Sequence, residues 1–264
     1  MKPLVSVLMS VHNEERWVMR AVTSMMSQSY ENLEIIIVND GSTDDTLEIL
    51  KNLQMHDDRI KIVNQENTGL TKALNNGLFH CKGKYVARMD ADNIAMPSRI
   101  RKQVSFLEDN PDFAVVGSWR IDVLPDGSER LHKVPDSNEE IQRTFVKRNC
   151  VSHSSVLVNA QTLRLFLYDE RFLTSQDFEL WTRIGKHWKL ANLPEPLCRA
   201  YQREKGITSS SNKWRTLKYK LIIHFRAYQR LKCPWWYFIF IPKPIVEFLI
   251  PTRLIERYVT WKLR

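Results

Sequence analysis

Residues 5–45 read VSVLMSVHNEERWVMRAVTSMMSQSYENLEIIIVNDGSTDD. This stretch contains two short apolar runs, Val5 to Met9 and Glu34 to Val38, and each run leads into polar residues. Between them, the apolar residues of Glu14 to Ser27 recur three and four positions apart, which predicts an amphipathic helix. Because the two runs are continuously apolar rather than alternating, they predict parallel strands covered by helices on both faces.

The same alternation continues along the chain. Ser42 or Thr43 can cap a second helix whose Leu47, Ile49, Leu50 and Leu53 face inward. Two further buried strands are predicted at Ile60 to Val63 and Tyr85 to Met89. Later elements are less regular: a helix from Ser98 to Glu108, a strand near Phe113 to Gly117, a hairpin turn at Pro125 to Gly127 and a helix over 177–187. We therefore predict an α/β fold with a mostly parallel central sheet flanked by helices.

Composition and charge divide the chain into two parts. The 264 residues are 43% hydrophobic and 26% charged, as in ordinary globular proteins, so disorder is not expected. The net charge of +9 is localised, since residues 213–264 hold 12 Lys and Arg against two acidic residues. We predict a main domain over 1–212 and a basic, aromatic C-terminal segment over 213–264. Nucleic-acid binding is not expected, because no recognised motif accompanies the charge.

Cysteine spacing and the N-terminus favour a cytoplasmic protein. The four cysteines are widely spaced and form no C-x-x-C pair, which argues against a disulfide scaffold and a thiolate metal site. The apolar run near the N-terminus is short and is soon ended by His12 to Glu15, so we interpret it as a strand rather than a signal peptide.

Polar residues follow three of the predicted strands. The first strand leads into Val11 to Glu14, the second into Asn39 to Ser42 and the fourth into Asp90 to Asp92. In open parallel sheets, ligands bind at this carboxyl edge. Each motif alone could be a turn or a surface pair. Together, however, clustered carboxylates repel one another, so they indicate a bound cation such as Mg²⁺ or Mn²⁺, which prefers oxygen ligands.

Five blocks of the chain, in this order, resemble the signature of the inverting GT-A glycosyltransferases of family 2, and they cover roughly residues 4–200. The blocks are SVHNE at 10–14, VNDGSTD at 38–44, NTGLTKALN at 67–75, GKYVARMDAD at 83–92 and SQDFELW at 175–181. The resemblance implies a Rossmann-like GT-A fold, with a nucleotide-sugar half over about 1–95 and an acceptor half over about 96–212. It also implies the transfer of a hexose or N-acetylhexosamine from a UDP-sugar to a saccharide acceptor in bacterial polysaccharide or lipopolysaccharide synthesis.

The resemblance assigns roles to individual residues. It implies donor binding by Val11, Asn13, Glu14, Asp40, Lys72, Arg88, Asp90 and Ala91. Asp92, with Asp90, would bind Mn²⁺ or Mg²⁺, and Asp177 would be the catalytic base. A single base agrees with an inverting displacement, in which one carboxylate accepts the acceptor's proton. Retention would need a second, nucleophilic carboxylate, and we identify none.

Two further residues have competing interpretations. His153 lies where relatives often have a histidine near the acceptor or the metal, but histidines are also often simply hydrogen-bonded. Trp181 could stack on an acceptor sugar, although a Trp on a helix is more often part of the core. The chain also departs from the family pattern, with Asn39, Asn93 and Gln176 where relatives often have acidic residues. These departures could alter the metal preference.

The C-terminal segment also has two interpretations. Residues 234–251 are aromatic and apolar but contain four prolines, so they are too broken to span a bilayer. They could insert at the surface of an anionic membrane, or they could pack on the catalytic domain or on another subunit of a homo-oligomer. Membrane binding would place the protein on the inner face of the cell membrane, where a lipid-linked acceptor is available.

Two other functions would use similar residues. Nucleotidyl transfer also employs strand-end acids and Mg²⁺, but it would require a Gly-rich basic loop where this chain has His12 to Glu15. A non-catalytic, membrane-bound scaffold would not need to keep Asp40, Asp90, Asp92 and Asp177 together.

Overall fold

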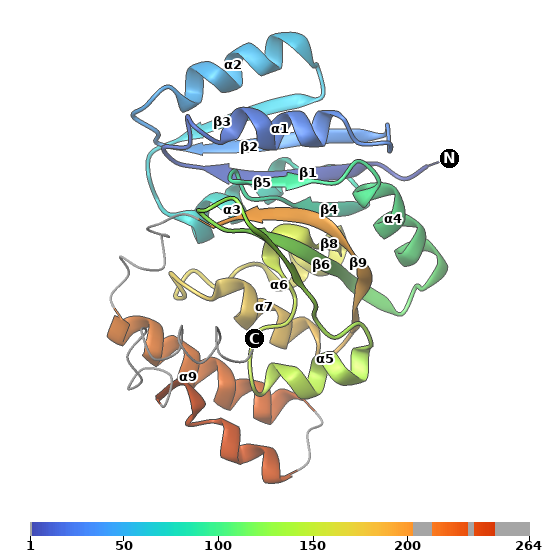
Figure 1. Cartoon of the computed structure of the whole chain (residues 1–264), viewed down its shortest axis with the longest axis vertical. Coiled ribbons are helices and arrows are strands. Elements are labelled where there is room, and N and C mark those ends of the chain that lie inside the picture. Colours follow the sequence, from blue (N-terminus) through green and yellow to red (C-terminus); the bar gives the residue numbers. More distant parts are fainter. Residues whose placement is uncertain (1, 203–212, 232–234, 246–264) are drawn as a thin grey trace.

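The structure is a computed structural model that describes residues 2–202, 213–231 and 235–245 (Figure 1). Four parallel strands form the first half of the central sheet, in the order β3-β2-β1-β4. They are β1 (Val5–Val11), β2 (Leu33–Asp40), β3 (Ile60–Gln65) and β4 (Tyr85–Arg88). All four strands predicted from the apolar runs are confirmed, and β1 and β2 extend two residues further, into the polar ends of their runs.

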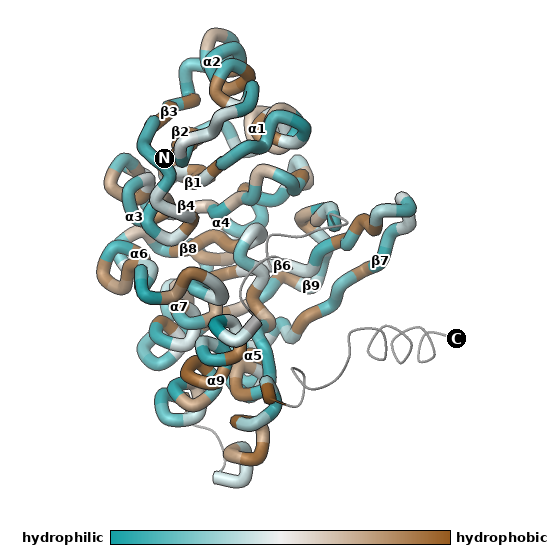
Figure 2. The backbone as a smooth tube through the Cα atoms, turned by 90° about the vertical axis from the view of Figure 1, so that its left-hand side faces the viewer, coloured by the Kyte–Doolittle hydropathy of each residue, from teal (hydrophilic) through white to brown (hydrophobic). Residues whose placement is uncertain are grey.

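The second half of the sheet is mixed. From β4 the order continues β8-β6-β9-β5, where β6 and β9 are parallel and the other neighbours antiparallel. These strands are β5 (Asn93–Ala95), β6 (Phe113–Val123), β8 (Leu157–Asn159) and β9 (Lys189–Tyr201). β7 (Glu129–His132) pairs with β6 in a hairpin that projects from the sheet (Figure 2). The predicted turn is confirmed, and Gly127 provides its positive φ of 81°.

Helices cover both faces of the sheet (Figures 1 and 2). On one face, α1 (Val18–Met26), α2 (Thr46–His56) and α4 (Arg99–Asp109) pack on a core that includes the odd-numbered residues of β1. On the other, α3 (Leu70–His80), α5 (Asn138–Phe145), α6 (Ala160–Phe166) and α7 (Gln176–Ile184) share a second core. The predicted α/β architecture with flanking helices is therefore confirmed.

The start of α2 differs from the prediction. Ser42 and Thr43 do not cap it, because both bond to Asn13 instead. The Ser42 hydroxyl accepts a hydrogen bond from the backbone amide of Asn13, and the backbone amide of Thr43 donates to the Asn13 side-chain oxygen. The helix instead begins at Thr46, whose amide donates to Asp44. Of the four apolar residues expected to face inward, Leu50 is fully buried and the other three are half-buried.

The C-terminal appendage, defined here as 213–231 and 235–245, comprises α9 (Lys213–Arg230) and η2, a short 3₁₀ helix (Trp235–Phe240). α9 packs on α7 and buries Ile223, Ala227 and Leu231 in the second core. In the structure α9 therefore packs on the main domain. Among the described residues, we find no helix that combines the length and the apolar composition of a membrane span. Residues 246–264 of the predicted segment lie outside the described residues.

Candidate active site

A cleft of about 750 Å³ lies at the carboxyl edge of the parallel strands. Its walls come from the ends of β1, β2 and β4, from the loop before α3 and from the end of β9. The lining residues are Ser10, His12, Glu14, Asp40, Asn67, Gly69, Leu70, Asp90, Ala91, Asp92, Leu173, Tyr201 and Gln202. The structure therefore brings together the three strand-end carboxylate groups that the sequence places far apart.

Asp40 stabilises one wall of this cleft. Its carboxylate is 2% exposed and accepts the backbone amides of Thr68 (2.8 Å) and Gly69 (2.9 Å), together with the Gln65 side chain (2.7 Å). Gly69 has φ 87°, which a side chain would strain, and α3 begins directly after it. Both carboxylate oxygens of Asp40 thus fix the loop that forms one wall of the cleft.

The other donor residues predicted on the first loop lie at different depths. Glu14 lines the cleft, and its amide donates to Thr46 at 2.7 Å. Val11 is buried in the sheet, and Asn13, at φ 56°, links the β1 and β2 loops. Lys72 is exposed on the first turn of α3 and is not among the residues that line this cleft. Among these four residues, the structure places only the Glu14 side chain at the cleft.

A second cleft of about 430 Å³ shares Asp90 and Asp92 with the first. Its lining includes Asp177, His153 and Asn149, together with Arg120, His132 and Arg148. Asp90 and Asp92 therefore stand between a nucleotide-sized cleft and a cleft that contains the predicted base.

Arg88 is the last residue of β4, two residues before Asp90, and is only 1% exposed. Its guanidinium forms an ion pair with Asp90, and it lines neither cleft. The structure therefore places Arg88 beside Asp90, outside the lining of both clefts.

Asp177 lies in the first turn of α7, immediately after Gln176. The helix is entered through Ser175, a non-glycine residue with φ 60°, so the backbone direction is tightly constrained there. The Asn149 side-chain amide donates to Asp177 Oδ2 at 2.8 Å. Burial raises the pKa of the Asp177 carboxyl, a shift that the backbone amide of Phe178 and the Asn149 amide oppose. A raised pKa makes a carboxylate a better proton acceptor.

The structure corrects the acceptor role considered for Trp181. This side chain is 0% exposed and belongs to the second core, so the alternative interpretation as a core residue is confirmed. His153 packs against Trp181 and Tyr168, and its Nε2 lies 2.8 Å from the Tyr168 hydroxyl. Burial, aided by the Arg88 charge, holds the pKa of His153 well below its usual value, so the imidazole is neutral.

Several residues of the second cleft were missed in the sequence. Asn149 and Arg148 lie in an irregular loop, and Arg120 lies on β6, where neither periodicity nor a motif marks them. Arg120 donates to the buried Asp122 at 2.7 Å and to Ser152 at 3.0 Å, which fixes its guanidinium at the cleft wall. Asn67 and Gly69, by contrast, line the first cleft and belong to the sequence block at 67–75. That block could have indicated them as donor-binding residues.

The carboxylates fit a divalent ion that takes few protein ligands. Within residues 2–202, 213–231 and 235–245, no group of three or more His, Cys, Asp or Glu side chains is close enough to hold a metal by itself. His153 is therefore not gathered with Asp90 and Asp92 into a three-ligand site. Mg²⁺ and Mn²⁺ sites commonly use one or two carboxylates completed by phosphate oxygens, which matches the Asp90 and Asp92 pair.

Comparison with known proteins identifies the family of the chain. The sequence model described as glycosyl transferase family 2 matches residues 6–170. The chain is 33% identical to the putative glycosyltransferase EpsE of Bacillus subtilis (strain 168), over 97% of this chain and 93% of that protein. It is also 33% identical to the amylovoran biosynthesis glycosyltransferase AmsE of Erwinia amylovora, over 74% of each chain.

Solved structures share the fold at lower identity. S. aureus TarS 1-349 in complex with UDP-GlcNAc superposes with a TM-score of 0.71 at 18% identity and covers 93% of this chain and 71% of that one. The mannosyltransferase PcManGT from Pyrobaculum calidifontis, in complex with GDP-Man and Mn²⁺, gives 0.69 at 18% identity over 94% and 69%. From the family match and the similarity to EpsE along nearly its whole length, we conclude that the chain belongs to glycosyl transferase family 2 and is a glycosyltransferase.

Proposed function

We propose that this enzyme transfers a sugar, with inversion, from a UDP-sugar to a saccharide acceptor, and that it depends on Mn²⁺ or Mg²⁺. The single observation that carries this proposal is the position of Asp90 and Asp92 between the two clefts. The larger cleft would take the nucleotide and the smaller one the acceptor, so the anomeric carbon would lie beside the carboxylates that both clefts share.

Each side chain would then have a defined task. Asp40 holds the wall of the nucleotide cleft, and Glu14 and Ala91 line it. Asp177 accepts the proton of the acceptor hydroxyl as that oxygen bonds to the anomeric carbon. The bond from the anomeric carbon to the diphosphate breaks on the opposite face, and UDP leaves with the electron pair. Asp92, with Asp90, would hold the divalent ion, which neutralises charge on the leaving diphosphate.

Similar proteins support the donor class and the metal. TarS binds UDP-GlcNAc in its solved complex, and PcManGT was solved with GDP-Man and Mn²⁺. We favour a UDP-sugar, with a hexose or N-acetylhexosamine as the sugar transferred. AmsE acts in amylovoran biosynthesis by its name, which supports a role in bacterial cell-surface polysaccharide synthesis. Family membership favours sugar transfer over nucleotidyl transfer.

The appendage supports a lipid-linked acceptor and a location on the inner face of the cell membrane. η2 exposes four large apolar side chains, Trp235, Trp236, Phe238 and Ile239. Paired tryptophans beside basic residues are typical of insertion at the headgroup boundary of an anionic membrane. Because η2 also contacts the loop at residue 147, next to Arg148 and Asn149 of the acceptor cleft, an acceptor anchored in the same membrane would lie close to Asp177.

A panel of UDP-sugars tests the proposal directly. With Mn²⁺ present, one member of the panel should be hydrolysed to UDP with water as the acceptor, and chelation should stop the reaction. The anomeric configuration of the released sugar, followed by NMR, should be inverted. If neither UDP nor any UDP-sugar raised the melting temperature in Mn²⁺, the donor site proposed here would be wrong.

A further inference from the structure

The C-terminal appendage contacts both elements that carry the hydrogen bond between Asn149 and Asp177. Asp177 belongs to α7, along which α9 packs. Asn149 belongs to the loop 146–149 that follows α5, and η2 packs against this loop. The appendage therefore reaches the proposed base from two sides.

The first contact fixes the beginning of α7. Glu179, two residues after Asp177, is 0% exposed, and three arginines surround its carboxylate. Arg183 of α7 donates to Oε2 at 2.7 Å, while Arg230 (3.1 Å) and Arg226 (3.5 Å) of α9 pair with Oε1. A buried carboxylate requires paired cations, so these ion pairs tie the first turns of α7 to α9.

The second contact involves the residue next to the base. Phe178 is 4% exposed, and its ring meets His224 of α9 edge-on at a centroid distance of 5.7 Å. The ring of Phe145, the last residue of α5, also packs against Phe178, at a centroid distance of 5.8 Å. The Phe178 ring is thus held between the appendage and the helix that leads into loop 146–149.

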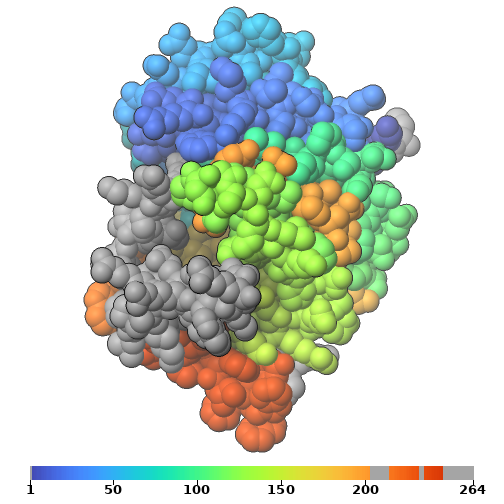
Figure 3. Space-filling view, viewed as in Figure 1, coloured from blue at the N-terminus to red at the C-terminus, as the bar shows by residue number. Residues whose placement is uncertain are grey.

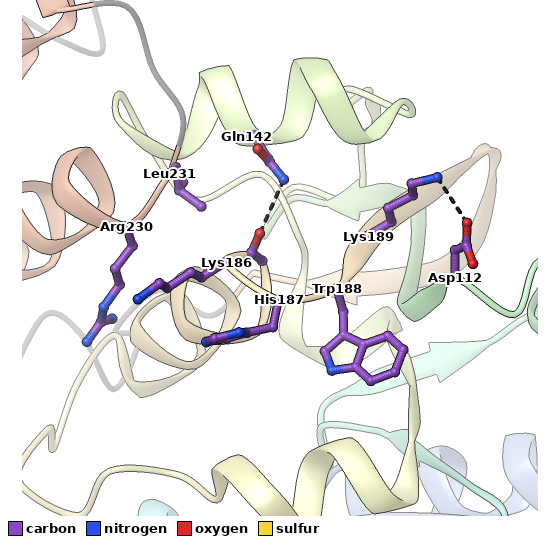
Figure 4. A pocket seen from close by; sticks show the side chains of 9 residues that line it. Asp112, Gln142, Lys186, His187, Trp188, Lys189, Arg230 and Leu231 are labelled. Atoms are coloured by element: carbon purple, nitrogen blue, oxygen red, sulfur yellow. Dashed lines mark hydrogen bonds and ion pairs between the residues drawn. The ribbon is translucent and has the colours of Figure 1, made fainter.

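The C-terminal end of α7 also lies between α5 and the end of α9 (Figure 4). Gln142 of α5 donates to the Gly185 carbonyl at 3.2 Å, and Arg230 donates to Thr182 at 3.0 Å. Arg230 and Leu231 line the hollow of about 500 Å³ between these elements. Since α5 and α9 both hold α7, the helix has little freedom to rotate about its axis.

The third contact fixes the loop. The Lys147 ammonium lies over the rings of Tyr237 (5.2 Å) and Phe240 (4.7 Å), and its carbonyl accepts a hydrogen bond from Lys243 at 2.9 Å. Two residues further, Asn149 Oδ1 accepts the Val151 amide at 3.1 Å, so the amide group is oriented with its NH₂ toward Asp177.

We propose that Asn149 is a positioning residue for Asp177, and that the appendage maintains this pair by clamping α7 and loop 146–149. The inference rests on the proposed role of Asp177 as the base. It gives the appendage a part in the chemical step, in addition to any membrane contact. The charged and titratable groups that act on Asp177 or share its cleft are Arg88, Asp90, Asp92, Arg120, His132, Arg148, Cys150, His153 and Tyr168.

Asn149→Ala tests the positioning role. Hydrolysis of the UDP-sugar selected by the panel should lose about ten- to a hundredfold in kcat, since a hydrogen bond to a charged group is removed, while the KM for the donor should not change. The acid limb of the pH profile should move to higher pH, because the lost donor favoured the charged form of Asp177. Asn52→Ala, on the exposed surface of α2, is the matched control and should resemble the parent.

Two variants test the clamp in a membrane-free assay, where loss of anchoring has no effect. Lys147→Ala and the double variant Arg226→Ala/Arg230→Ala should each lower kcat about tenfold and leave UDP affinity unchanged, because the nucleotide cleft lies on other elements. Arg143→Ala, an exposed arginine of α5, controls for the lost charge. Should the double variant fail to fold, Lys147→Ala carries the test alone.

The outcomes separate this inference from the proposed function. If Asp177→Asn abolishes hydrolysis while Asn149→Ala keeps the parental kcat and pH profile, the positioning role is overturned and the base assignment stands. If Lys147→Ala keeps the parental kcat, the clamp is overturned. If Asp177→Asn itself stays active, the assignment of the base is wrong and the inference fails with it.

Discussion

The proposed donor side and the proposed acceptor side of the active site are built differently. On the donor side, residues at the ends of adjacent parallel strands meet, and backbone amides hold the Asp40 carboxylate. On the acceptor side, Asp177 depends on a side chain from an irregular loop and on a helix clamped by α9. The family match also ends at residue 170, before α7 begins. In Figure 3 the proposed donor half, at the N-terminus, lies at the top of the molecule. The proposed acceptor half and α9 lie below it.

We infer from this difference that the two sides serve different purposes. A wall made of strand ends and backbone amides changes little when surface side chains change, which suits a nucleotide common to many reactions. A base held by loop and appendage side chains can be repositioned by single substitutions, which suits acceptors that differ from enzyme to enzyme. If the division holds, variants on one side should leave the properties of the other side intact.

The largest expected effect is that of Asp177→Asn. Transfer should fall about 10²- to 10⁴-fold in kcat, the usual contribution of general base catalysis. UDP affinity in Mn²⁺, measured by calorimetry, should remain at the parental value, because Asp177 does not line the nucleotide cleft. A weakened UDP affinity would break the separation of the two sides.

Asp92→Ala should affect both sides, because Asp92 lines both clefts. We expect kcat/KM to fall about 10²- to 10³-fold, the cost of losing one electrostatic stabiliser of the leaving group. The gain in melting temperature caused by UDP with Mn²⁺ should also disappear. Stabilisation equal to that of the parent would mean that the divalent ion binds elsewhere.

Asp40→Asn should weaken the donor side alone. The substitution replaces a charged acceptor of the Thr68 and Gly69 amides by a neutral one, which should lower the free energy of unfolding by about 2 kcal/mol. Chemical denaturation measures this loss, and UDP affinity should fall with it. The pH profile of hydrolysis at saturating donor should stay unchanged, since Asp177 is untouched.

Asp177→Asn should also raise stability at neutral pH. Burial raises the pKa of Asp177 in the folded protein above the ordinary value of 3.8, so the fold favours the protonated form. Its contribution to stability is therefore present below that value and is lost as pH rises through the raised pKa. The variant should melt at a higher temperature than the parent at neutral pH, with a gain that vanishes in acid, as calorimetry at several pH values can determine.

The smallest effect concerns the appendage surface. Trp235→Ser/Trp236→Ser should reduce binding to anionic phospholipid vesicles about fivefold in a sedimentation assay, since interfacial affinity scales with buried apolar area. Hydrolysis in the absence of vesicles should not change, because Tyr237 and Phe240, the two rings that contact Lys147, both remain in this variant. Parental vesicle binding would leave the appendage with its packing role only.

The sequence alone predicted the edge of the sheet at which the carboxylates gather. The four apolar runs determine parallel strands, and the geometry of such sheets requires Glu14, Asp40 and Asp90 to meet at one edge. It predicted individual side-chain roles less well: Lys72 lies outside the cleft, and Trp181 is in the core. Helical periodicity gives the buried face of a helix, but it does not distinguish a residue that faces a ligand from one that faces the protein.

The sequence by itself determined the α/β class and the carboxylate edge, because both follow from local apolar patterns and from the direction of parallel strands. Only the tertiary structure decided that Asn149 meets Asp177, that Arg88 pairs with Asp90 and that α9 clamps α7. These contacts join residues from irregular loops and distant helices. Their pairing depends on how the elements pack in three dimensions, which no local periodicity encodes.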